Sequence, residues 1–227
     1  MSAPLVFYFD VISPTPTSPG RRSTPCRAPR PRCRARAHPL RGAPQRLWPY
    51  KGPAEIPPKR VYIFKDVLRS AARLGVPLAP PPAHPFNPLL ALRVASVPMP
   101  QDRQRALIHA LYRATWGGGG GVESTPRVAA AIAEVGLDPE ATIREATSEV
   151  GKARVRARTE ERWRAASSES PRSGPMAEIF WGLDALGHLD RFLAGQDPID
   201  PAALARWSSL PSSASRISRR IGSLRWA

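Results

Sequence analysis

The 227-residue sequence predicts an α/β protein in which a long helical region separates two short strand-forming segments. Residues 5–11 (LVFYFDV) are apolar, aromatic and β-branched, as in a buried strand. From about residue 57 to residue 164, apolar residues recur at three- and four-residue spacing, which is typical of amphipathic helices. Residues 179–181 (IFW) again suit a strand. Hydrophobic residues make up 42% of the chain, which is enough to build a core.

An arginine- and proline-rich tract follows the first predicted strand. Residues 15–47 contain nine arginines and seven prolines, and no acidic residue occurs from Val11 to Ala54. Each proline removes a backbone donor and clashes with the preceding turn, so the tract cannot form a continuous helix. The tract supplies +9 of the net charge of +16. Read literally, it is a disordered or polyproline-like segment.

Order returns in the central region, where proline and glycine mark the helix ends. Prolines begin the first helix and Gly75 ends it, and Asp138 is the expected cap of the last helical stretch. Five glycines at 117–121 lack the Gly-Lys-Ser/Thr ending of a phosphate-binding loop, so we expect only a flexible connection there. The helical stretches are residues 57–75, 87–97, 101–116, 124–138 and 138–163, the last as one helix or two.

The C-terminal part predicts one further helix and a loose tail. We expect a helix that runs to Leu193, with Asp184 in its first turn. There the negative charge of Asp184 lies at the positive end of the helix dipole. After Gly195 the chain is rich in serine, proline and arginine, with one short helix near residues 201–207.

Several protein classes are excluded by composition. The two cysteines, Cys26 and Cys33, provide neither a disulfide framework nor a zinc-ligand pattern, so we expect no metal site. No apolar run is long enough to span a membrane, and the N-terminus has no basic region before its apolar run, as a secretory signal would. We therefore expect a cytoplasmic protein that does not bind a membrane.

Five segments, taken in their order and spacing, resemble the 2-hydroxychromene-2-carboxylate isomerases. These enzymes are relatives of the kappa-class glutathione transferases and of the DsbA-like branch of the thioredoxin superfamily. The resemblance implies a thioredoxin-like domain from residues 1–56 and 165–195, interrupted by a helical insertion domain at 57–164 and followed by a loose tail at 196–227. The segments are FYFDVISP, KGPAEIPPKRVYIFKDVLRSAARLGVPL, HPFNPLLALR, LYRATW and FWGLD.

Two parts of the family pattern are missing, one after Pro14 and one before Phe180. If the DNA has lost one base, the codons of residues 15–20 permit Tyr-Ala-Tyr-Leu-Ala-Trp in the neighbouring frame. The same shift over residues 161–172 permits a sequence that ends in Val-Phe-Gly-Val-Pro-Thr. Both products are the missing motifs. We therefore hypothesise that residues 15–50 and 162–177 are frame-displaced, that the second strand of the sheet is lost, and that the chain as written is poorly folded and inactive.

The resemblance implies a glutathione-assisted cis–trans isomerisation in aromatic catabolism, with glutathione as cofactor. The substrate is a chromene carboxylate that interconverts with an open benzylidenepyruvate-type acid. Ser13 matches the family's catalytic serine, whose hydroxyl stabilises the glutathione thiolate, with help from the N-terminus of a following helix. Without the resemblance, Ser13 is an ordinary turn or capping serine before Pro14.

Five other residues match or suit binding positions. Asp184 and Leu183 match the position that receives the γ-glutamyl end of glutathione, although Asp184 also fits a plain helix-start charge. Lys51 and Lys59 suit an anionic carboxylate of cofactor or substrate, or are simply solvated. Asn87 matches a residue on the substrate side and, by sequence alone, is a helix cap.

Other functions stay open at this point. A kappa-like glutathione transferase is not separable from an isomerase by sequence, whereas a DsbA-like thiol oxidoreductase is disfavoured because no Cys-x-x-Cys motif stands at Ser13. A basic nucleic-acid-binding protein would use the arginine tract, but no aromatic residue lies between Arg21 and Arg46 and no named binding motif occurs. The sequence leaves the oligomeric state open, and a homodimer is one state we consider.

Overall fold

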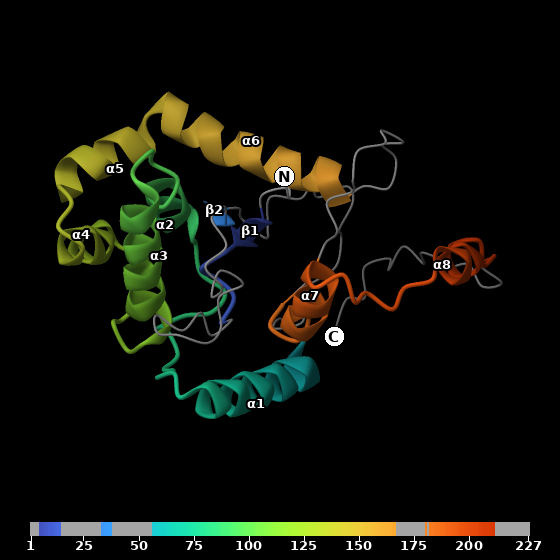
Figure 1. Ribbon diagram of the computed structural model, residues 1–227. Helices are drawn as coiled ribbons and strands as arrows, with labels where there is room; N and C mark the ends of the chain where they lie inside the picture. The colour runs from blue at the N-terminus through green and yellow to red at the C-terminus, as the bar shows by residue number, and fades with distance from the viewer. Residues whose placement is uncertain (1–4, 15–32, 38–55, 167–179, 181, 212–227) are drawn as a thin grey trace, which may run out of the picture. The chain divides into compact units, whose positions relative to one another are not determined.

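The computed structural model describes residues 5–14, 33–37, 56–166, 180 and 182–211 (Figure 1). By its contacts the chain forms two compact units, Met1–Leu186 and Gly187–Ala227. The first strand and the central helices therefore belong to one compact unit. The finer division into a thioredoxin-like domain and a helical insertion stays a prediction.

A parallel pair of strands forms the described sheet. β1 (Leu5–Phe9) pairs with β2 (Cys33–Ala37) in a register that runs from Leu5 opposite Cys33 to Phe9 opposite Ala37. The expectation that residues 15–50 are irregular and the second strand lost is wrong for residues 33–37. Their sequence, Cys-Arg-Ala-Arg-Ala, alternates small and charged residues with the period of a strand. It lacks the bulky β-branched residues by which strands are recognised, and the pairing with β1 decides its conformation. The rest of the predicted irregular tract lies outside the described residues.

The described residues 56–166 form six helices, which together confirm the five predicted helical stretches. Gly75 ends the first of them in a left-handed conformation (φ 64°), and its N–H caps the carbonyls of Ala71 and Ala72. Asp138 caps another by accepting from the N–H groups of Glu140 (2.9 Å) and Ala141 (3.2 Å), as predicted. The helices are α1 (Pro57–Leu74), α2 (Leu89–Val94), α3 (Gln101–Trp116), α4 (Thr125–Glu134), α5 (Pro139–Thr147) and α6 (Glu149–Ala166).

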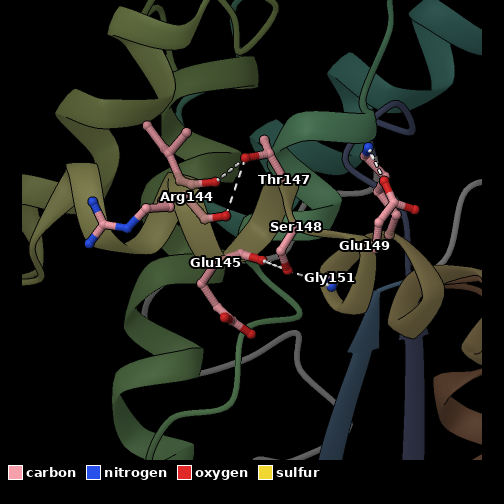
Figure 2. A network of polar contacts seen from close by, with 8 residues as sticks. Arg144, Glu145, Thr147, Ser148, Glu149 and Gly151 are labelled. Carbon is pink, nitrogen blue, oxygen red and sulfur yellow. Dashed lines mark hydrogen bonds and ion pairs between the residues drawn. The ribbon is translucent and has the colours of Figure 1, made fainter.

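The last helical stretch is divided into α5 and α6 at Ser148 (Figure 2). Ser148 is extended (ψ 161°), and its hydroxyl both donates to the carbonyl of Glu145 (2.7 Å) and accepts from the N–H of Gly151 (3.1 Å). A Cβ on Gly151 would lie 2.5 Å from the carbonyl oxygens of Glu145 and Ala146. The break therefore needs both a capping serine and a glycine three residues later.

A cluster of buried hydrophobic side chains joins the end of β1 to α2, α3, α4 and α5. Four large aliphatic side chains, each fully buried, contribute about 1.5–3 kcal/mol apiece in transfer free energy. Phe9, Val11 and Ile12 pack into the same cluster. The segment that leads to Ser13 is thus part of the helical core rather than a surface loop. The four aliphatic residues are Leu92, Leu107, Leu111 and Ile132.

The five glycines at 117–121 form a defined turn rather than the flexible loop that the sequence predicts. Three of them have positive φ angles between 79° and 95°, which glycine adopts without strain. A Cβ on Gly119 would lie 2.7 Å from the Cα of Ala114. The N–H of Gly121 also donates to the Ala114 carbonyl (2.8 Å), which folds the turn back onto α3. Close backbone packing is the reason for glycine here.

The periodicity of α1 predicts one apolar face, and other described residues bury only part of that face. Its members are Val61, Phe64, Leu68 and Ala71. Ala71 is buried and the Phe64 ring contacts His84. Val61 and Leu68 are 55% and 57% exposed. A helical pattern defines a face but not what covers it.

The C-terminal region contains α7 (Leu186–Leu193) and α8 (Pro201–Ser208). Asp200 caps α8 by accepting from the N–H of Ala202 (3.0 Å), and this helix confirms the short one expected near 201–207. Of the predicted strand at 179–181, only Phe180 is described, and it is not part of a strand. Within the described ranges, no helix is both long and apolar enough to cross a membrane.

Candidate functional site

A tight turn carries the chain from β1 to Ser13. The carboxylate Oδ1 of Asp10 accepts from the N–H of Ile12 (3.0 Å), and the Asp10 carbonyl accepts from the N–H of Ser13 (3.4 Å). This aspartate-centred turn is a local hydrogen-bonded alternative to continuing the strand. Asp10, Val11 and Ile12 are at most 7% exposed, whereas Ser13 is partly exposed. We call residues Asp10–Ser13 the strand-end turn; Ser13 is where it reaches the surface.

Three side chains from the helical region hold the strand-end turn through its backbone. The Tyr112 hydroxyl donates to the Asp10 carbonyl at 2.9 Å. The Trp116 indole N–H donates to the Val11 carbonyl at 2.8 Å. His84 Nε2 lies 3.1 Å from the carbonyl oxygen of Ile12. Three consecutive buried carbonyls are therefore each satisfied by a side chain rather than by a neighbouring strand, as buried backbone groups require.

Tyr112 remains a donor across the working pH range. Full burial, and secondarily the negative charge of Asp10, raise the pKa of Tyr112 well above its ordinary value of 10. The hydroxyl therefore keeps its proton, and the bond to the Asp10 carbonyl persists.

An aromatic cage fixes the His84 ring. The ring centroid lies 6.0 Å from that of Phe64, 6.3 Å from that of Phe86 and 5.7 Å from that of Trp116. A carbonyl oxygen only accepts hydrogen bonds, so Nε2 must carry the proton that points at Ile12. Nδ1 of the same ring is buried and has no hydrogen-bond partner among the described residues.

Two of the predicted site residues are close in sequence to these groups. Ser13 belongs to the strand-end turn, and Asn87 is three positions after His84. β1 ends at Phe9, two residues earlier than the predicted strand at 5–11, because the chain turns at Asp10, so Ser13 lies four residues beyond the strand at the end of the turn. The helix predicted to follow Ser13 falls outside the described residues. Asn87 is exposed, and its Oδ1 accepts from the N–H of Leu89 at the start of α2 (3.1 Å). The N-cap residue of α2 is Pro88, so Asn87 stands one position earlier than a cap but still satisfies the first N–H of the helix. A role of Asn87 toward substrate stays a prediction.

The predicted glutathione-binding residues lie in separate segments. Lys59 is exposed in the first turn of α1, and Lys51 falls outside the described residues. Leu183 is partly buried and Asp184 exposed, both in a turn at 182–185. α7 begins only at Leu186, so the expectation that Asp184 stands in its first turn is wrong. Gly182, with φ 78°, and the bond from the N–H of Leu186 to the Leu183 carbonyl form a turn there instead.

The sequence patterns predict no role in the site for Tyr112, Trp116 or His84. A signal was present: Tyr112 and Trp116 stand four residues apart on the apolar face of α3, and both rings carry polar tips. Tyrosine and tryptophan usually find a hydrogen-bond partner when they are buried. That rule predicts bonds from both tips, but it does not identify carbonyls more than a hundred residues away.

An open groove of about 620 Å³ lies between α3, the glycine turn and α4, and none of the predicted site residues line it. Its charged side chains already contact protein groups. Arg113 pairs with Glu134, and Arg127 donates to the Gly119 carbonyl (2.7 Å). The groove is therefore a less suitable site than the strand-end turn.

The strand-end turn presents one hydroxyl at the protein surface on a rigid backbone. A serine O–H can donate to an anion bound beside it, which favours the anionic form of that group. No sulfur atom lies among residues 10–14, so the turn itself cannot perform thiol–disulfide exchange. In the part of the chain that the structure describes, no group of three or more metal-ligating side chains occurs.

Comparisons with known proteins show the family and the fold of the chain. Residues 4–165 match the family model for the DSBA-like thioredoxin domain. The solved structure of a 2-hydroxychromene-2-carboxylate isomerase superposes with a TM-score of 0.65 at 19% sequence identity, covering 89% of this chain and 96% of that one. At this identity the likeness shows a shared fold. No protein with a curated description matches the sequence.

Proposed function

This chain belongs to the family of DSBA-like thioredoxin domains, and we propose that it is a glutathione-dependent cis–trans isomerase of 2-hydroxychromene-2-carboxylate-type aromatic acids. We propose further that the segments at 15–50 and 162–177 lower its activity. One observation carries the proposal. Ser13 is partly exposed at the end of the strand-end turn, whose backbone is held by three buried side chains.

The residues present fit the thiol of glutathione. Ser13 offers a neutral donor, and a donor favours a thiolate over a thiol because it stabilises the charged form. Bound glutathione would supply the nucleophilic sulfur that adds reversibly to the conjugated system of the substrate. The carbon–carbon double bond whose geometry changes would then become a single bond, about which rotation is possible. Ser13 would keep its own proton throughout and donate a hydrogen bond whenever the sulfur is negative.

Lys59 and Asp184 would act at the two ends of the bound molecules. The ammonium of Lys59 suits a carboxylate of substrate or cofactor, and the carboxylate of Asp184 suits the glutathione amine. Both side chains are exposed, so we expect each to change the binding of its ligand more than the rate of the chemical step.

The proposal is tested by turnover of a chromene carboxylate with and without glutathione. Ser13→Ala should lower kcat by about 10²-fold, as expected for loss of one donor to a developing anion. Ser70→Ala is the matched control, because Ser70 is also partly exposed but lies on α1. Turnover that needs no glutathione, or a Ser13→Ala rate equal to wild type, would contradict the proposal.

A second substrate separates the two family activities. An aryl halide carries a leaving group that the sulfur displaces, so it reports transferase activity and not isomerisation. Conjugation of the aryl halide without isomerisation of the chromene carboxylate would make the protein a kappa-like transferase.

A further inference from the structure

The peptide unit that joins Ile12 to Ser13 is held at both of its polar ends. Its carbonyl oxygen lies 3.1 Å from His84 Nε2, and its N–H donates to the Asp10 carbonyl at 3.4 Å. A peptide unit is planar, so two bonds at its opposite ends fix the position of the Ser13 Cα as well. Only the φ and χ1 rotations of Ser13 then remain to move its hydroxyl.

His84 is suited to one task in this arrangement. Its ring is packed among Phe64, Phe86 and Trp116, so an apolar ring of similar size would fill the same space. Its Nδ1 is buried without a described partner, which is an unfavourable condition for a polar atom. The polar contribution of His84 within the described structure is thus the bond to the Ile12 carbonyl.

We infer that His84 is a positioning residue for Ser13, acting through the Ile12 carbonyl. This inference rests on the proposed function. His84 holds the peptide plane and the plane holds the Ser13 Cα, so the hydroxyl meets the sulfur over a narrower range of positions. Loss of the bond leaves the serine present but more mobile, which lowers kcat more than it raises KM because orientation matters most in the transition state.

The experiment compares three substitutions at His84. In His84→Gln the side-chain amide nitrogen reaches about as far as Nε2 and keeps the donor, whereas His84→Asn is too short. His84→Phe fills the cage without a donor. His109→Phe is the matched control, because His109 is also a partly buried histidine whose Nδ1 lacks a described partner, and no described bond joins it to residues 10–13. Circular dichroism checks that each variant is folded.

We expect kcat to fall about tenfold in His84→Phe and His84→Asn, the scale of one lost hydrogen bond, with KM within about twofold of wild type. His84→Gln should recover most of kcat, and His109→Phe should match wild type. If His84→Phe does not fold, His84→Asn decides. Equal kcat in Phe, Asn and Gln variants, whether high or low, overturns the inference.

Amide hydrogen exchange at Ser13 separates this inference from the proposed function. If the wild-type chain has no isomerase activity, the proposed function fails. The exchange rate of the Ser13 amide still shows whether His84 holds the strand-end turn. We expect the Ser13 amide to exchange about tenfold faster in His84→Asn than in wild type, with the wild-type rate restored in His84→Gln. Unchanged exchange in His84→Asn means that His84 does not hold the turn.

Discussion

Trp116 donates its indole hydrogen to the carbonyl of Val11 over 2.8 Å, although the two residues lie 105 positions apart in the sequence. The contact joins the last residue of α3 to the turn that ends β1. Together with the bond from Tyr112 to Asp10, it makes the geometry of Ser13 depend on the helical region. A change in α3 should therefore affect both stability and the site.

Trp116→Phe tests the stabilising part of this relationship. Phenylalanine keeps an aromatic ring in the core but removes the donor, which leaves the fully buried Val11 carbonyl without its partner. We expect the free energy of unfolding to fall by about 2–3 kcal/mol, as measured by urea denaturation. Trp207→Phe serves as control, because Trp207 is 75% exposed on α8. This substitution should leave the urea denaturation midpoint unchanged. Equal effects of the two substitutions would show that the indole bond contributes nothing.

Tyr112→Phe should change the dependence of stability on alkaline pH. The folded state keeps the Tyr112 proton above pH 10, because its pKa is raised, whereas the unfolded state loses that proton near the ordinary value of 10. Unfolding therefore releases a proton, and stability falls as pH rises above 10 by up to about 1.4 kcal/mol per pH unit. Urea denaturation from pH 8 to pH 11 should show this slope in wild type and a shallower one in Tyr112→Phe. Parallel curves would mean that Tyr112 titrates normally in the folded protein.

Gly119→Ala tests whether the glycine turn is defined by packing. The new Cβ would lie 2.7 Å from the Ala114 Cα, a backbone atom that cannot move aside without shifting α3. We expect a loss of about 1–3 kcal/mol in the free energy of unfolding. Gly187→Ala is the control, since no atom lies within 4 Å of its Cβ position and alanine favours helix α7. A tolerated Gly119→Ala would indicate a flexible loop, as the sequence alone suggests.

Restoring the reading frame tests the proposed impairment of the chain. A gene that encodes Tyr-Ala-Tyr-Leu-Ala-Trp after Pro14 and Val-Phe-Gly-Val-Pro-Thr before the Phe-Trp-Gly segment would supply both missing motifs. We expect the restored protein to unfold more cooperatively and to turn over chromene carboxylate faster than the chain as written. Cooperative unfolding and glutathione-dependent turnover of the unrestored chain at the restored rate would contradict the frame hypothesis. Resequencing of the gene is an independent check.

Local interactions made most of the helices predictable. The spacing of apolar residues, the cap at Asp138 and the left-handed Gly75 lie within a few residues of the structure they determine. The resemblance also identified the family correctly, because a family pattern is carried by ordered sequence segments. The same residues predict a strand before Ser13, and the structure has that strand, although it ends at Phe9 and a turn separates it from Ser13.

The sequence by itself determined the family, the helical stretches and some of their ends, such as those at Gly75 and Asp138. Only the tertiary structure decided that residues 33–37 form a strand, that the glycine turn is packed, and that His84, Tyr112 and Trp116 hold the strand-end turn. For the strand and the strand-end turn, the physical reason is distance along the chain. The strand pairing and the three side-chain bonds to the turn join residues separated by 28 to 105 positions, and no local propensity or periodicity specifies which distant carbonyl or strand a group will meet. The glycine turn packs against Ala114, which is near in sequence, but a run of glycines does not by itself specify so close a backbone approach.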